Sequence, residues 1–200
     1  MYIKFIIRMI LFFLISSGIV GCSLVDEGLS TKNNEGTISC LMNGEPFEVE
    51  GGKGLLASEF VKAEMEKSED YFLLTVYGIR VLEEEEEKRG LAVGFKLGGE
   101  RLMDIGQGDT FTKWEVLDEI EGTFEGAMGG VEERKSESAD EHLLKASSNH
   151  TGKMNITVTA IDTLDQLISG TFHFTAKDQK SGEVIEVTEG AFENIKWVNK

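Results

Sequence analysis

The chain has 200 residues, of which 40% are hydrophobic, and this is enough for one domain with a substantial core. It contains 36 acidic and 20 basic residues, which give a formal net charge of −16. This balance excludes nucleic-acid binding and electrostatic adsorption to an anionic membrane, since both require clustered Lys and Arg. A solvated acidic surface accounts for the charge, and a cationic partner such as Ca²⁺ is the weaker alternative.

The first 21 residues have the composition of an export signal. Lys4 and Arg8 form a positive flank, and the uncharged run over residues 9–15 is shorter than the roughly 20 residues of a membrane-spanning helix. The following Ile19-Val20-Gly21-Cys22 resembles the lipobox of bacterial lipoproteins. This resemblance implies a signal peptide over residues 1–21, cleavage before Cys22, and acyl chains of the palmitate type on that cysteine. A plain secretory signal or an uncleaved anchor is the alternative, although an Ala-x-Ala-like cleavage site is missing here.

A polar stretch follows the cysteine, and we expect residues 22–35 to be a flexible acylated tether and residues 36–200 to be a single β-rich domain. Ser23 after Cys22 is compatible with release to the outer membrane. Asp26-Glu27 resembles the acidic pair that Bacteroidota-type lipoproteins use for surface export. The resemblance implies an outer-membrane, surface-exposed protein, with a periplasm-facing one as the alternative.

The second cysteine, Cys40, has no partner for an intramolecular disulfide if Cys22 is acylated. It lies in an apolar segment and has no histidine near it in the sequence. We expect it to be a small buried side chain rather than a catalytic thiol.

The first expected strands are residues 37–42 and 47–50, which flank the hairpin pair Asn43-Gly44. Pro46 suits an edge strand, because it has no amide proton to donate. The segment from Ser58 to Lys67 fits either a helix or a strand, and we favour a strand because its neighbours are strands. Residues 71–81 are so apolar that both faces of that strand should be buried.

Further strands are expected at residues 91–97 and 110–117, whereas the polar stretch 129–149 is expected to be a long exposed loop or a loop with one strand. Alternating apolar residues then predict strands at 153–162, 168–177, 183–188 and 191–198. The short connections 178–182 and Glu189-Gly190 predict an antiparallel C-terminal meander. The fold class is therefore all-β, an antiparallel sandwich or barrel of about ten strands.

Two parts of this pattern carry a family likeness. Residues 40–47 resemble the opening strand of small Bacteroidota cell-envelope lipoproteins of unknown function, and residues 168–176 and 182–192 resemble their closing strands. The resemblance implies a location and a β-architecture. It brings no activity, catalytic residue or ligand.

No motif indicates a cofactor or a catalytic centre. His142, His150 and His173 lack the spacing of a zinc site, and no Gly-x-Ser-x-Gly elbow is present. The loop that contains Asp104 and Asp109 is faintly suggestive of calcium, without the acid pattern of an EF-hand. Asp162-Thr163-Leu164 resembles the O-glycosylation motif of Bacteroidota secreted proteins, which would place a sugar on Thr163.

These observations favour a non-catalytic, lipid-anchored binding or interaction module, whose partner is a glycan, a protein or a small apolar ligand. A structural envelope-accessory lipoprotein without a small ligand is the alternative, and a hydrolase is the least favoured. A closed apolar cavity would indicate a carrier, and exposed aromatic rings near Trp114 or Trp197 would indicate glycan or protein contact. A filled core with a featureless surface would indicate the accessory role.

Overall fold

The computed structural model describes residues 35–51, 59–68, 71–84, 87–116, 124–135 and 142–200. The expected signal peptide, Cys22 and the tether up to residue 34 lie outside these residues. Within the described ranges, the model contains no helix with the length and apolar character needed to cross a membrane.

The described residues are almost entirely strand, which confirms the predicted all-β class. The strands are β1 (Thr37–Met42), β2 (Glu45–Glu50), β3 (Glu59–Lys67), β4 (Phe72–Glu84), β5 (Glu87–Gly99), β6 (Thr110–Phe111), β7 (Glu115–Val116), β8 (Phe124–Lys135), β9 (His142–Ser147), β10 (Lys153–Asp162), β11 (Leu167–Asp178), β12 (Val184–Lys196) and β13 (Val198–Asn199). Two single-turn 3₁₀ helices, η1 (Leu102–Asp104) and η2 (Ser148–His150), interrupt them.

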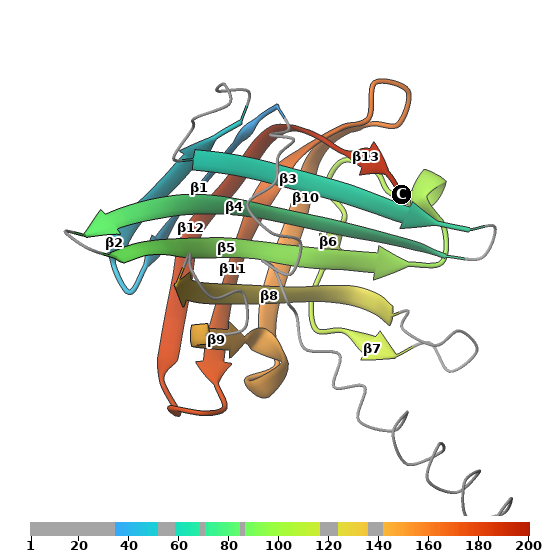
Figure 1. The fold of residues 1–200 in the computed structure, drawn as a ribbon. Coiled ribbons are helices and arrows are strands. Elements are labelled where there is room, and N and C mark those ends of the chain that lie inside the picture. Colours follow the sequence, from blue (N-terminus) through green and yellow to red (C-terminus); the bar gives the residue numbers. More distant parts are fainter. Residues whose placement is uncertain (1–34, 52–58, 69–70, 85–86, 117–123, 136–141) are drawn as a thin grey trace, which may run out of the picture.

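One sheet contains the long strands, in the order β13-β3-β4-β5-β8-β9-β11-β12-β1-β2, and it curls on itself as a half-barrel. Strands β3, β4, β5 and β8 form one layer, and β10, β11, β12, β1 and β2 cross behind them as a second layer (Figure 1). Strand β9 joins the layers because it pairs with both β8 and β11. All strand pairs are antiparallel except the short pair β13–β3.

The Asn43-Gly44 turn is confirmed as the connection between β1 and β2. Both residues have the positive φ angles of a tight hairpin turn, 49° and 87°. The Asn43 side chain also accepts a hydrogen bond from the Glu186 amide at 2.9 Å, and the Asn43 amide donates to the Glu186 carbonyl at 2.8 Å. The turn therefore fixes the hairpin to β12. Strand β2, with Pro46, ends the sheet as expected.

The C-terminal meander is confirmed, but it is built differently from the expected one. The expected turn at Glu189-Gly190 is wrong, because both residues lie inside the single strand β12. Glu189 has a φ of 52°, and the register of β12 against β11 shifts there, so the pair forms a bulge. The meander consists of β10, β11 and β12.

The middle of the chain also differs from the expectation. The polar stretch after Gly129 is not a long exposed loop, because β8 continues to Lys135 and is buried along most of its length. The expected strand over residues 110–117 is reduced to the two-residue strands β6 and β7. The segment that was ambiguous from Ser58 to Lys67 is a strand from residue 59 onward.

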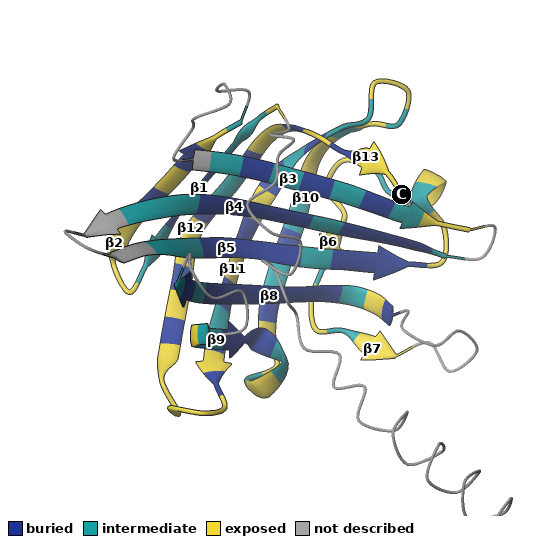
Figure 2. Ribbon diagram, viewed as in Figure 1, coloured by how far each residue is buried: buried dark blue, intermediate teal, exposed yellow. Residues whose placement is uncertain are grey.

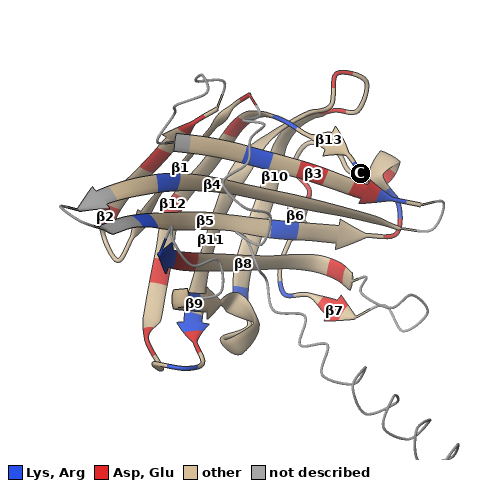
Figure 3. Ribbon diagram, in the orientation of Figure 1, with Lys and Arg blue, Asp and Glu red and all other residues tan. Residues whose placement is uncertain are grey.

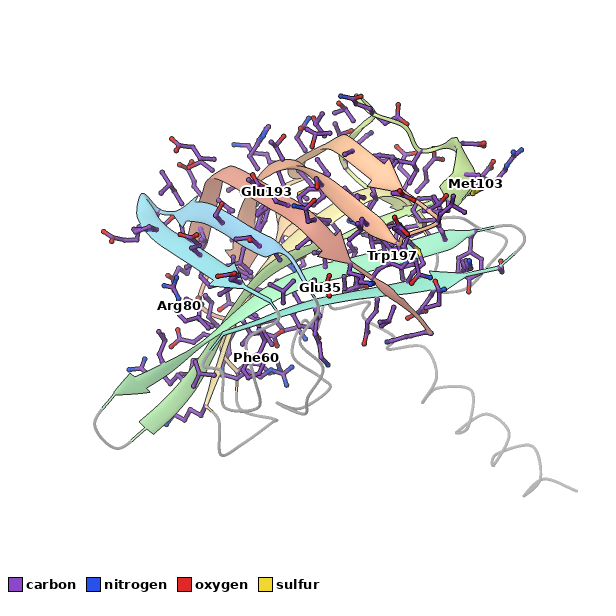
Figure 4. All side chains as sticks on the ribbon, turned by 90° about the horizontal axis from the view of Figure 1, so that it is seen from above. Glu35, Phe60, Arg80, Met103, Glu193 and Trp197 are labelled. Atoms are coloured by element: carbon purple, nitrogen blue, oxygen red, sulfur yellow. The ribbon has the colours of Figure 1, made fainter. Side chains whose placement is uncertain are left out.

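The main core fills the space between the two layers, and Figure 2 shows it as buried stretches on most of the long strands. The ring of Phe95 on β5 lies 5.6 Å from that of Phe172 on β11 and 4.9 Å from that of Phe192 on β12. Burial of each such side chain stabilises the fold by about 1.5–3 kcal/mol. Arg80 of β4 (Figure 4) lies over the ring of Phe47 and donates a hydrogen bond to the Glu48 carbonyl at 2.7 Å.

A second, smaller cluster of buried side chains lies on the other face of the β4–β5–β8 layer. Leu73, Tyr77 and Ile79 of β4 pack there with Met128 and Phe124 of β8. Tyr77 lies directly against Gly94, where an added Cβ would approach within 2.4 Å of the Tyr77 Cβ. Both faces of β4 are therefore buried, as its apolar sequence predicts.

Candidate functional site

A pocket lies where the two layers separate, between one edge of β8 and one edge of β10. The β8 edge is paired with β7 at one end and with β9 at the other. The β10 edge is paired with β6, at Ile156 and Thr157. We call the space between these short pairings the seam pocket. It has a volume of about 260 Å³ and is lined by Lys113, Trp114, Ala127, Ser148, Asn149, Gly152 and Met154.

Trp114 reaches the seam pocket because a glycine lets its segment approach β8. Gly126 has a φ of +105°, and a Cβ there would lie 2.2 Å from the Lys113 carbonyl oxygen. The Ala127 amide donates to the Thr112 carbonyl at 2.8 Å, which fixes the same segment. The Trp114 indole packs edge-to-face on Phe124, with the ring centroids 6.0 Å apart. Its position is therefore set before any ligand arrives.

The opposite wall of the seam pocket comes from η2, the turn between β9 and β10. Ser148 is buried, and its hydroxyl accepts a hydrogen bond from the Gly129 amide of β8 at 2.9 Å. The Asn149 amide donates to the Ser147 hydroxyl at 3.3 Å. The Asn149 side-chain oxygen is buried and has no hydrogen-bond partner among the described residues. A buried acceptor without a partner destabilises a fold by about 1–3 kcal/mol, so a donor group that reached this oxygen would relieve that cost.

A shallower hollow lies next to the seam pocket on the outer face of the β10–β11–β12 meander. We call it the sheet-face groove; its volume is about 590 Å³, and Gly152 and Met154 line both hollows. The strand register places Lys153, Thr175 and Glu186 in one row across the three strands. Asn155 and His173 are partners in the neighbouring row, which continues toward the β12 bulge.

The seam pocket could be predicted from the sequence only in part. Trp114 stands out as one of two tryptophans, and it is half-buried at the pocket. Trp197 is 2% exposed and belongs to the core, so it offers no contact surface. Asn149, Ser148 and Gly152 have no sequence signature, because the pairing of β8 with β9 brings them to the pocket.

The two calcium candidates, Asp104 and Asp109, each interact with a neighbouring residue of their own loop. Asp104 forms an ion pair with Arg101 at 3.2 Å, and Asp109 accepts a hydrogen bond from the Gly106 amide at 2.8 Å. Within the described ranges, three or more potential metal-ligating side chains do not gather anywhere. A calcium site there stays a prediction without a supporting geometry.

Thr163 lies in the turn between β10 and β11, and the turn is ordered by the Asp162 carboxylate. This carboxylate accepts hydrogen bonds from the Leu164 and Asp165 amides, both at 2.9 Å. Leu164 is 93% exposed, whereas Thr163 is half-buried. Glycosylation of Thr163 stays a prediction.

The three histidines lie in separate environments. His173 is exposed in the sheet-face groove, and His150 contacts Gln179 at 3.1 Å from its Nδ1. His142 lies at the start of β9, where its Nδ1 is 2.5 Å from a Glu132 carboxylate oxygen.

Sequence reasoning missed a buried charged pair on β8. Glu132 and Arg134 are 1% and 3% exposed, and Arg134 donates to the Glu132 carboxylate from Nε at 2.9 Å and from Nη2 at 2.8 Å. These two nitrogens share one carboxylate oxygen with His142. Polar residues in alternation indicate a surface strand or a loop, and the pattern gives no sign that the charges neutralise one another inside the fold.

The two hollows lie on an acidic all-β domain. Lys and Arg are spread over several strands, among them β3, β4, β5 and β8 (Figure 3), and Arg89 of β5 lies opposite Lys135 of β8. Residues 115–196, from β7 to β12, match a family model described as a domain of unknown function (DUF6252). The match agrees with the expected likeness to an uncharacterised family. No significant match is found among curated proteins or among solved structures.

Proposed function

We propose that this protein is a non-catalytic binding module, held to the outer membrane of a bacterium by acyl chains on Cys22 and exposed at the cell surface. The lipobox-like Ile19-Val20-Gly21-Cys22 and the acidic pair Asp26-Glu27 support the location. The seam pocket supports the binding role. It combines an aromatic ring, which supplies apolar contact, with a polar group that has no partner of its own among the described residues.

The arrangement of Trp114 and Asn149 is the observation on which the binding role depends. Ligand sites are concave, with apolar walls and a few fixed polar groups that orient the ligand. Trp114 and Met154 supply the apolar wall, and Asn149, Ser148 and Lys113 supply the polar groups. The rigid β-scaffold holds both walls, because each is hydrogen-bonded to β8.

The anchor is tested by replacing Cys22 with alanine in the full chain, produced in a bacterium that acylates lipoproteins. Burial of each CH₂ group of a lipid chain contributes about 0.8 kcal/mol, so two or three chains give an effectively permanent attachment. We expect the unaltered chain in the membrane fraction after a high-salt wash, and the Cys22→Ala variant as soluble protein or uncleaved precursor. Equal membrane retention of both chains would refute the anchor. Protease treatment of intact cells tests surface exposure, and full protection would place the domain in the periplasm.

The binding role is tested on the purified full chain through the fluorescence of Trp114. Only two tryptophans are present, and Trp197 is buried, so a quench or shift on ligand addition reports the seam pocket. A panel of fatty acids, peptides, nucleotides and oligosaccharides should contain at least one class that changes this signal. A panel without effect would favour the structural accessory role instead.

A further inference from the structure

The seam pocket and the sheet-face groove adjoin at Gly152. This residue lines both hollows, has a φ of +65°, and an added Cβ would meet no atom within 4 Å. Met154 also lines both. The absence of a side chain at residue 152 leaves a low passage between the two hollows, so a single long ligand can occupy both.

The lining of the groove selects a ligand that both donates and accepts hydrogen bonds. Lys153 donates, Glu186 accepts, and the Thr175 hydroxyl between them does both. In the neighbouring row, the Asn155 amide and the His173 imidazole each offer a donor and an acceptor. Closely spaced groups of both kinds match a chain of hydroxyl groups better than an apolar chain, which would leave these side chains without partners.

The charges in the groove disfavour an anionic ligand. Glu186 and Glu189 both line it, and the whole chain has a net charge of −16. Only Lys153 and, in the seam pocket, Lys113 supply positive charge. Phosphates and acidic sugars would therefore meet two carboxylates along the groove, whereas a neutral ligand would not.

The seam pocket adds an apolar wall at one end of the polar sheet-face groove. Its volume of about 260 Å³ has room for one sugar ring. The C–H groups of such a ring can pack against the Trp114 indole. The unpartnered Asn149 oxygen can accept a hydrogen bond from a hydroxyl group of the same ring. The larger groove, at about 590 Å³, has room for the following units.

We infer that the two hollows together bind one neutral oligosaccharide, with a terminal ring in the seam pocket against Trp114 and the next units across β10, β11 and β12. This inference rests on the proposed function, since it names the ligand class of the same site. The hydroxyl groups of the ligand that face the protein exchange hydrogen bonds to water for hydrogen bonds to Asn149, Asn155, His173 and Thr175.

The test measures binding of neutral hexasaccharides to the full chain, with glucose-, mannose-, xylose- and N-acetylglucosamine-based members as the probes. Calorimetry and the fluorescence of Trp114 are both recorded. We expect one member to bind and to change the fluorescence. Loss of the aromatic contact in Trp114→Ala, or of the hydrogen bond in Asn149→Ala, should weaken that binding by about tenfold.

The variant His173→Ala separates the groove from the seam pocket. His173 is exposed on β11, so its truncation leaves the core intact. It should weaken the binding of the hexasaccharide by about fivefold and leave that of the matching monosaccharide unchanged. Leu164→Ala is the control, because Leu164 is 93% exposed in the turn at the other end of β10 and should bind as the unaltered chain does.

Each other outcome overturns the inference. If all hexasaccharides fail while another chemical class changes the Trp114 signal, the ligand class is wrong and the binding role stands. If no class binds, the binding role fails with it. If a hexasaccharide binds but Trp114→Ala, Asn149→Ala and His173→Ala leave its affinity unchanged, the sugar binds elsewhere on the protein.

Discussion

Asp178 shows how a single carboxylate can organise a turn between two long strands. It is 5% exposed, and it accepts hydrogen bonds from the Ser181 hydroxyl at 2.6 Å, the Ser181 amide at 2.9 Å and the Lys180 amide at 3.2 Å. Burial alone would raise the pKa of this carboxyl. The hydrogen bonds from Ser181 and Lys180 together outweigh that effect and hold the pKa below its usual value.

The lowered pKa of Asp178 has a definite consequence for stability. A carboxyl whose pKa is lower in the folded state stabilises the fold above its unfolded pKa, near 3.9, and this contribution is lost as pH falls further. We expect Asp178→Ala to reduce the free energy of unfolding by about 1–3 kcal/mol at pH 7. The difference from the unaltered chain should shrink below about pH 4, as measured by urea unfolding. The exposed control Asp165→Ala should stay within about 0.5 kcal/mol at both pH values, and an equal loss there would contradict the role of Asp178.

Cys40 has the opposite kind of perturbation. Burial raises the pKa of its thiol to about 12, against a smaller lowering effect from Arg80. Because the thiolate is the reactive form, the folded protein should not react with iodoacetamide at pH 8. In the Cys22→Ala background, where Cys40 is the only thiol, we expect no modification by mass spectrometry until urea unfolds the chain. Rapid modification of the folded protein would show that the residue is accessible.

At the scale of single elements, close strand packing depends on particular glycines. Gly170 lies on β11 between Val158 of β10 and Phe192 of β12. An added Cβ would lie 2.3 Å from the Thr157 carbonyl oxygen and 2.5 Å from the Phe192 ring. Backbone cannot give way as a flexible side chain can, so the strands would have to separate.

We therefore expect Gly170→Ala to reduce the free energy of unfolding by at least about 2 kcal/mol. Gly106→Ala is the matched control, because a Cβ there meets nothing within 4 Å and the residue has no positive φ. The control should change stability by less than about 0.5 kcal/mol in thermal or urea unfolding. Equal stability of the two variants would contradict the close contact of β11 with Thr157 and Phe192 at Gly170.

The strands that alternate apolar and polar residues could be predicted from the sequence, and those that break the alternation could not. The β1–β2 hairpin follows from Asn43-Gly44, and β10 follows from its periodicity. The periodicity of the β3 segment fits a helix as well as a strand, and only its strand neighbours favour the strand. Strand β8 was missed because Glu132 and Arg134 satisfy each other inside the fold. The Glu189-Gly190 pair predicts a turn but forms a bulge, and both structures need a left-handed backbone of the kind that Glu189 adopts.

The candidate site was less predictable than the fold, for a geometric reason. Its two walls come from the segment around Trp114 and from η2, which are separated by more than thirty residues of sequence. Only the register of β8 with β7 and β9 brings them together. A tryptophan in a polar segment is visible in the sequence, whereas the asparagine that faces the same pocket is not.

At the scale of the whole molecule, the two layers leave the polar face of the meander open while the apolar residues fill the space between them. Along β11 and β12, exposed residues of the outer face alternate with buried residues of the core face (Figure 2). The apolar residues between the two layers therefore stabilise the fold, whereas the polar residues on the outer face of β10, β11 and β12 are free to contact a ligand.

Strand β1, the first strand of the described residues, is paired with β12, which is almost the last of them. The pairing of β1 with β12 cannot form until β12 has been synthesised, which happens near the end of translation. Contacts this distant in sequence slow folding. Under the proposed export of this chain, slow folding would keep the polypeptide unfolded until it reaches the translocation channel.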